Sequence, residues 1–186
     1  MGRGPLFGPV VAAAVVLPEA AFEPLQKLGV TDSKKLSDRR RLQLLPEIRR
    51  LALDCRIGVA TVTEIDRLNI LQATFLAMRR AVAKLEQPPQ LALVDGNRRV
   101  PGLTLDQRTL IGGDARCLTI ACASIVAKVW RDQLIERLAQ RYPGYGLERH
   151  KGYGTAEHRQ AIATLGLTPQ HRRSFAPCRE QQLTLL

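Results

Sequence analysis

The chain has 186 residues and a mass of 20.6 kDa, and its composition, 45% hydrophobic and 24% charged, is ordinary for one globular domain. This composition excludes collagenous, disordered and coiled-coil proteins. The longest aliphatic run, Val10 to Leu17, is far shorter than the roughly 20 residues that cross a bilayer. The N-terminus also lacks a secretory signal, so we expect a cytoplasmic protein with no membrane segment.

Lys and Arg total 28 against 17 Asp and Glu, which gives a net charge of +11 and a pI of 10.3. A pI above about 9 is typical of proteins that bind nucleic acids. Aromatic residues are only 4% of the chain, which argues against a platform for stacking single-stranded bases. A duplex held by its phosphates fits better, and a basic surface without a ligand is the alternative.

The hydrophobic pattern predicts strands and helices that alternate along the chain. Strands are predicted over residues 10–17, 56–62, 91–94 and 107–111, and helices over residues 38–52, 70–85, 119–140 and 155–165. Such an order indicates an α/β layered domain with a mixed central sheet flanked by helices.

Several residues mark where the predicted helices begin and end. Ser37 and Thr155 are expected N-caps, and Gly166 is an expected C-cap. Thr63, followed three residues later by Asp66, resembles another helix start. Pro46 is expected to kink or break the first long helix.

Cys55, Cys117, Cys122 and Cys178 are scattered without a CxxC pair, which argues against a zinc cluster and against a disulfide framework. We expect reduced thiols that act as small apolar side chains.

Two acidic residues are candidates for catalysis. Asp95 follows a predicted apolar strand and precedes Gly96, the place where open α/β sheets bind ligands, although an Asp-Gly pair is also common in turns. Asp114 lies between a predicted strand and the long helix, where it can approach Asp95 or simply interact with the helix dipole. Carboxylates of this kind bind Mg²⁺, which assists phosphodiester hydrolysis.

Two glycine-rich segments are candidates for binding a sugar-phosphate chain. Gly2-Arg3-Gly4 permits close backbone approach, or is a frayed terminus. His150 to Thr155 places a basic pair, Tyr153 and two glycines before a helix, where they can meet a phosphate or a sugar; the alternative is a capped loop. His158 and His171 have no metal-binding spacing, and we expect both on the solvated surface.

Many ordered segments of the chain closely resemble bacterial ribonuclease HII, from residue 2 to about residue 177. The segments are Gly2 to Leu6, Gly8 to Ala13, Asp32 to Ser37, Leu68 to Thr74, Val94 to Asn97, Gly113-Asp114, Ala123 to Val129, Arg131-Asp132, Tyr142 to Gly146, His150 to Thr155 and His171 to Pro177. The resemblance implies a ribonuclease H-like fold over residues 1–177, as one catalytic domain and a monomer, with residues 178–186 as a loosely held tail.

The resemblance also implies a function. Ribonucleases of this family cleave the RNA strand of RNA-DNA hybrids and incise at ribonucleotides embedded in duplex DNA, with Mg²⁺ or Mn²⁺. Asp95 and Asp114 match the family's metal ligands, and Asp132 matches a position outside the direct coordination shell of the metal. Gly2, Arg3 and Gly4 match the loop that reads the ribonucleotide's 2′-hydroxyl, and Tyr153 matches the tyrosine that packs on the neighbouring DNA sugar. Lys34, Lys35, Lys128 and Arg131 are candidates for phosphate contact.

One element of the family pattern is missing from the sequence. The pattern opens with a strand that ends in Asp-Glu-Val directly before Gly-Arg-Gly, and its two carboxylates are metal ligands. Here Met1 occupies the valine position and the first acidic residue is Glu19. We expect the natural protein to begin upstream and to include this strand; the alternative is a catalytically inactive module that binds hybrids.

Overall fold

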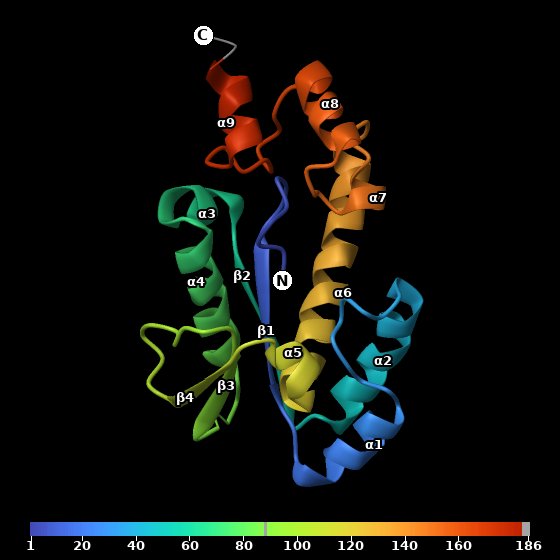
Figure 1. Cartoon of the computed structure of the whole chain (residues 1–186), viewed down its shortest axis with the longest axis vertical. Coiled ribbons are helices and arrows are strands. Elements are labelled where there is room, and N and C mark those ends of the chain that lie inside the picture. The colour runs from blue at the N-terminus through green and yellow to red at the C-terminus, as the bar shows by residue number, and fades with distance from the viewer. Residues whose placement is uncertain (88, 184–186) are drawn as a thin grey trace. The chain divides into compact units, whose positions relative to one another are not determined.

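The structure is a computed structural model that describes residues 1–87 and 89–183, with side chains through residue 180. The structure contains both strands and helices, as the hydrophobic pattern predicts (Figure 1). In chain order they are β1 (Val10–Val16), η1 (Glu19–Ala21), α1 (Phe22–Lys27), α2 (Asp38–Leu51), β2 (Asp54–Ala60), α3 (Val62–Leu68), α4 (Ile70–Val82), β3 (Leu91–Asp95), β4 (Asp106–Leu110), α5 (Gly113–Arg116), α6 (Leu118–Arg141), α7 (Leu147–His150), α8 (Ala156–Leu165) and α9 (Ala176–Leu183).

The backbone forms two compact units. The first contains Met1 and residues 11–59 and 75–129, and the second contains residues 2–10, 60–74 and 130 onward. The long helix α6 contributes residues to both units. The sequence predicted one domain over residues 1–177, and that boundary stays a prediction.

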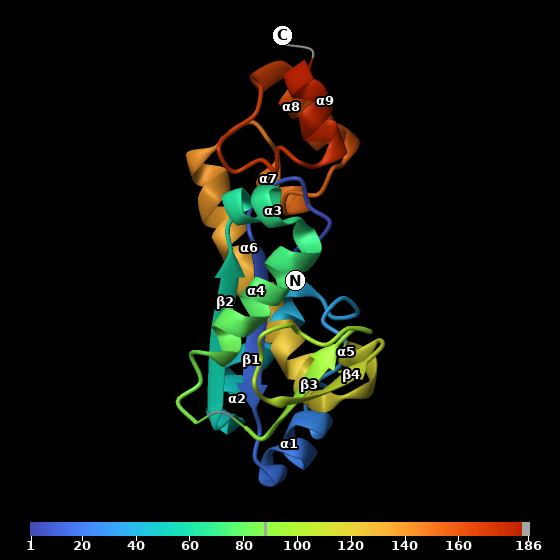
Figure 2. The same ribbon diagram turned by 90° about the vertical axis from the view of Figure 1, so that its left-hand side faces the viewer.

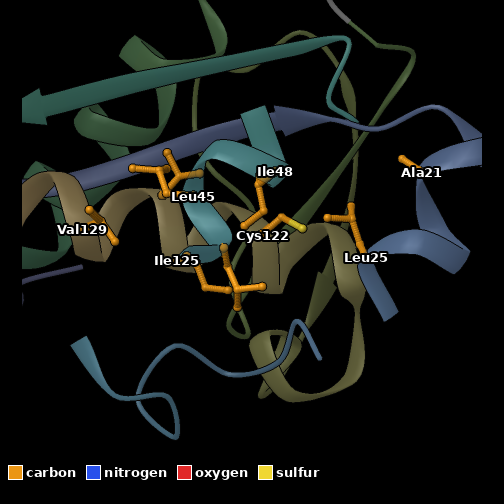
Figure 3. Close-up of a cluster of buried hydrophobic side chains, with 9 residues drawn as sticks. Ala21, Leu25, Leu45, Ile48, Cys122, Ile125 and Val129 are labelled. Carbon is orange, nitrogen blue, oxygen red and sulfur yellow. The ribbon is translucent and has the colours of Figure 1, made fainter. Parts of the chain in front are cut away.

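Each unit has its own hydrophobic core. The first core joins one face of α6 to α2 and to the η1–α1 segment, as Figure 3 shows for Ile125, Cys122, Ile48 and Leu25. The second core is built from segments far apart in the sequence. Its buried members are Leu6, Phe7, Ile135, Tyr145, Leu147, Ile162 and Cys178.

The described strands form two sheets of two strands each. β1 pairs with β2, and the Leu53 amide donates to the Val16 carbonyl, so the start of β2 lies beside the end of β1 (Figure 2). β3 pairs in parallel with β4, with Asp95 opposite Leu110. The α/β class is confirmed, whereas the single mixed sheet that the sequence predicted is seen here as two separate pairs of strands.

Side-chain caps define several helix ends. The Ser37 hydroxyl accepts from the Arg40 amide, and Thr155 caps α8 in the same way, as the sequence predicted. α2 continues through Pro46, so the predicted break is wrong. The predicted start at Thr63 is also wrong, because Thr61 and Glu64 form a capping box two residues earlier.

The C-terminal segment is more ordered than the sequence indicated. Residues 176–183 form α9, and Cys178 is fully buried in the second core, whereas a loose tail was expected from residue 178; residues 184–186 of that expected tail lie outside the described residues. Within the described part of the chain, no helix combines the length and the apolar character needed to cross a bilayer.

Candidate active site

Asp95 is the last residue of β3 and lies where the parallel pair ends. Its Oδ1 accepts a hydrogen bond from the Gly113 amide at 3.0 Å, and the following amide, that of Gly96, donates to the Leu110 carbonyl. The chain that leaves β4 therefore places the first residue of α5 against the Asp95 carboxylate. A side chain at position 113 would place its Cβ 3.4 Å from Asp95 Oδ1 and 2.6 Å from a methyl group of Ile120, so glycine allows this close approach.

Asp114 directly follows Gly113, the residue whose amide bonds to the Asp95 carboxylate. Its side chain is 9% exposed, and its Oδ2 lies 3.2 Å from Nζ of Lys34. The hydrogen bond to Asp114 raises the pKa of Lys34, so the ammonium group stays charged. The approach of the Asp95 and Asp114 carboxylates to each other, which the sequence predicts, stays a prediction.

The segment that carries Lys34 is shaped by short polar contacts. The Asp32 carboxylate accepts from the Lys34 amide at 2.9 Å, an Asx-turn contact, and the buried Ser33 hydroxyl bonds to Ser124 of α6 at 2.7 Å. These contacts hold the backbone so that Lys34 reaches Asp114, although its side chain is 69% exposed.

The donor set suits a hard divalent cation. Mg²⁺ is commonly held by one or two carboxylates and completes its shell with water and substrate phosphate, and Asp95 and Asp114 supply two carboxylates. Residues 1–87 and 89–183 contain no group of three or more Asp, Glu, His or Cys side chains arranged around one ion position. The upstream Asp-Glu pair stays a prediction.

The second unit contains the glycine-rich loop at the N-terminus. Arg172 is fully buried and donates to three carbonyl oxygens of this loop: Nη2 to Gly2 at 2.7 Å, Nη1 to Arg3 at 3.0 Å and Nε to Gly8 at 2.9 Å. Burial lowers the pKa of Arg172 to about 9. The loop is therefore fixed, which argues against the frayed terminus considered from the sequence.

Arg131 holds the same loop from α6. It is 1% exposed and donates to the carbonyl oxygens of Phe7, Pro9 and Lys151. Gly2 has φ of +79°, and a Cβ there would lie 2.2 Å from Arg131 Nε. The predicted phosphate contact of Arg131 is therefore corrected, because its guanidinium is turned inward and bonded to the loop.

Tyr153 lies beside the exposed part of the loop. Its side chain is 45% exposed, and a Cβ built on Gly4 would be 3.6 Å from Tyr153 Cε1. The Leu6 amide donates to the Gly152 carbonyl at 2.8 Å, and this bond ties the two segments together. One exposed surface is thus formed by Arg3, Gly4 and Tyr153, on a loop that the buried arginines hold in place.

The remaining predicted residues lie elsewhere. Lys35 is exposed next to Lys34. Lys128 and Asp132 lie on α6, where Lys128 is half-buried and Asp132 is 8% exposed.

The prediction that His158 and His171 are solvated is wrong. They are 0% and 1% exposed, and their Nε2 atoms lie 3.1 Å apart. His150 stacks on His158 with ring centroids 4.6 Å apart. Sequence reasoning missed this cluster because its members come from three separate segments; the only signal was that two of the three lie in segments that match the family.

Comparison with known proteins agrees with the fold. The family model described as ribonuclease HII matches residues 1–178. A ribonuclease HII of Synechococcus elongatus is 66% identical over 175 residues, which are 94% of this chain and 81% of that protein. The ribonuclease HII of Acaryochloris marina is 61% identical over 183 residues, 98% of this chain and 92% of the relative.

Solved structures show the same fold. The ribonuclease H2 of Pyrococcus horikoshii superposes with a TM-score of 0.81 at 28% identity, covering 99% of this chain and 94% of that one. An Archaeoglobus fulgidus ribonuclease HII, solved in complex with PCNA, gives 0.78 at 27% identity over 96% of this chain and 93% of that one. The family match and the fold together define a nuclease of the ribonuclease H type. The chain belongs to the ribonuclease HII family. It is an endoribonuclease of RNA-DNA hybrids, in a family that depends on divalent metal ions.

Proposed function

We propose that this protein incises duplex DNA at embedded ribonucleotides as well as cleaving the RNA strand of hybrids. The observation that carries the proposal is the exposed surface of Arg3, Gly4 and Tyr153 on a loop fixed by two buried arginines. The 2′-hydroxyl is the local difference between RNA and DNA, and a rigid glycine backbone can approach it closely. Tyr153 then packs on the sugar that follows.

Asp95 and Asp114 are the proposed ligands of the catalytic Mg²⁺ or Mn²⁺. Bound there, a divalent cation supplies Lewis-acid stabilisation of the charge that develops on the scissile phosphate. The Gly113 amide fixes the orientation of the Asp95 carboxylate. Lys34 holds Asp114 in place and, being largely exposed, can contact a substrate phosphate.

The net charge of +11 supports phosphate binding by lysine side chains. Lys34, Lys35 and Lys128 are the proposed contacts. Affinity for any duplex should therefore fall steeply with salt, and loss of one such lysine should weaken hybrid and DNA binding about equally. The cytoplasmic location and the monomeric state stay predictions.

Binding measurements test junction recognition separately from cleavage. Dissociation constants are compared, with a chelator present, for a DNA duplex and for the same duplex with one ribonucleotide. We expect the wild type to prefer the ribonucleotide, Tyr153→Ala to lose most of that preference, and Tyr153→Phe to keep it because the ring remains. Equal affinity of the wild type for the two duplexes would contradict the proposal.

The alternative, a hybrid-binding module without activity, predicts the same preference but no cleavage when Mg²⁺ or Mn²⁺ is added. Family membership favours the enzyme.

A further inference from the structure

The buried histidines lie under the backbone that presents Tyr153. His158 Nδ1 lies 3.0 Å from the Tyr153 carbonyl oxygen, and His158 Nε2 lies 3.1 Å from His171 Nε2. His171 Nδ1 in turn lies 2.9 Å from the Thr168 amide nitrogen. Four groups therefore form one continuous hydrogen-bonded chain that ends on Tyr153.

The partners at the two ends of this chain fix where its protons lie. The Thr168 amide can only donate, so His171 Nδ1 must be an acceptor and the His171 proton must be on Nε2. The Tyr153 carbonyl can only accept, so His158 must carry its proton on Nδ1. His158 Nε2 is then the acceptor that the His171 N–H requires, and every ring nitrogen is satisfied with both rings neutral.

His150 makes further hydrogen bonds around the segment that carries Tyr153. Its Nδ1 accepts from the Gly152 amide at 3.2 Å, and its Nε2 donates to the Tyr145 carbonyl at 2.8 Å. Tyr153 donates its own amide to the His150 carbonyl, and its carbonyl also accepts from the Thr155 amide. The histidines thus fix both peptide groups that flank Tyr153.

We propose that His158 and His171 are positioning residues for ribonucleotide recognition, and that their directed hydrogen-bond chain holds Tyr153 at the angle the sugar requires. This proposal rests on the proposed role of Tyr153. Neither histidine contacts the substrate: the buried pair acts through the Tyr153 carbonyl. The relay, which is the hydrogen-bond chain from Thr168 through His171 and His158 to Tyr153, is independent of the Asp95 and Asp114 carboxylates. Its loss should therefore lower the selectivity for a ribonucleotide rather than the rate of the chemical step.

The chain of donors explains why two histidines are used where an apolar pair would pack as well. An added proton on His171 Nδ1 would face the Thr168 N–H, and one on His158 Nε2 would face the His171 N–H. Burial also lowers the pKa of His158 to about 4 and that of His171 to about 3. The relay therefore keeps one direction throughout the physiological pH range.

Three variants separate positioning from packing. His158→Phe keeps an aromatic ring on His150 but removes the donor to Tyr153, and His158→Asn restores a donor near the Nδ1 position. Tyr145→Phe is the matched control, because it removes a different, partly buried hydrogen bond, from the Tyr145 hydroxyl to the Gly166 carbonyl at 2.9 Å, in the same core. All are compared by the ratio of dissociation constants for the DNA duplex and the duplex with one ribonucleotide.

We expect His158→Phe to lower this ratio at least about fivefold, a change of about 1 kcal/mol, with partial recovery in His158→Asn and little change in Tyr145→Phe. If His158→Phe keeps the wild-type ratio, or if Tyr145→Phe loses as much, the relay has no positioning role. A wild type without any preference would instead overturn the role of Tyr153, and with it this proposal.

Nitrogen-15 NMR of the wild type provides a test that needs no variant to fold. The relay predicts a neutral His158 with its proton on Nδ1, and neutral His171 and His150 with theirs on Nε2, at pH 7. A protonated ring, or His158 with its proton on Nε2, would overturn the proposal.

Discussion

Arg172 donates a 2.7 Å hydrogen bond to the carbonyl oxygen of Gly2, a residue 170 positions away in the sequence. This contact joins the segment between α8 and α9 to the glycine-rich loop at residues 2–8 and holds that loop in one conformation. Arg131 is the second buried guanidinium under the same loop, and its positive charge further lowers the pKa of Arg172. Both guanidinium groups donate to backbone carbonyl oxygens, and the negative charges of Asp132 and Asp66 partly offset the effect of burial on the pKa of Arg131 and of Arg172.

Replacement of Arg172 by Met should destabilise the protein strongly. Three carbonyl oxygens lose their donor, and the bonds to Gly2 and Gly8 are buried. Each buried polar group without a partner costs about 1 to 3 kcal/mol. We expect urea denaturation to show a loss of at least about 3 kcal/mol. The exposed neighbour provides the control, since Arg173→Met should change stability by less than about 0.5 kcal/mol; similar losses in both variants would show that the buried bonds contribute little.

Gly2→Ala should cost more than the backbone conformation alone explains. Gly2 and Gly166 have the same φ of +79°, but a Cβ at Gly2 meets Arg131 at 2.2 Å while one at Gly166 meets nothing within 4 Å. Gly166, with ψ of −169°, lies in a backbone region that glycine alone occupies readily, so Gly166→Ala should show only the backbone strain of about 1 to 3 kcal/mol. Thermal and urea unfolding of the two variants measure the difference, and equal losses would mean that the loop moves away from Arg131 freely.

Lys34→Gln should strengthen divalent-ion binding at the carboxylates. The ammonium group neutralises part of the Asp114 charge that attracts a cation, but it is 69% exposed, so its effect is limited to about 1 kcal/mol or a fivefold change in affinity. Titration with Mn²⁺, followed by calorimetry or by water proton relaxation, measures this affinity. Lys35→Gln is the control, and weaker Mn²⁺ binding in Lys34→Gln would place the ion elsewhere.

Stability should fall as the pH drops below about 6.5. The pKa values of buried His158 and His171 are lowered to about 4 and about 3 from an unfolded value of 6.5, so the unfolded chain binds these protons first. The stabilisation is complete above pH 6.5 and is lost progressively toward pH 4, by up to about 2 kcal/mol for each histidine at pH 5. Urea unfolding at pH 7, 6 and 5 measures the slope; a flat profile would mean that the histidines titrate normally.

Local sequence patterns predicted the parts of this structure that local forces determine. The strand ending at Asp95 and the helix between Thr155 and Gly166 depend on hydrophobic periodicity and caps, and both are observed. The roles of Arg131 and His158 could not be read in this way. An arginine or histidine is ordinarily exposed, and only partners from distant segments make its burial favourable.

The same reasoning applies to the candidate site. Asp95 and Asp114 could be proposed from their positions after a strand and before a helix, because strand ends gather at one edge. The bond from Gly113 to Asp95 and the pairing of Lys34 with Asp114 depend on side-chain geometry that no spacing encodes.

Mapping the cut in a duplex with a single ribonucleotide tests the central claim most directly. A DNA duplex carrying one ribonucleotide, with the end of that strand labelled, is incubated with wild type or Asp95→Asn in Mg²⁺ or Mn²⁺. We expect one incision at the ribonucleotide, none in the all-DNA duplex, none with a chelator, and loss of cleavage but not of binding in Asp95→Asn. Cleavage of the all-DNA duplex, or near-normal cleavage by Asp95→Asn, would contradict the account.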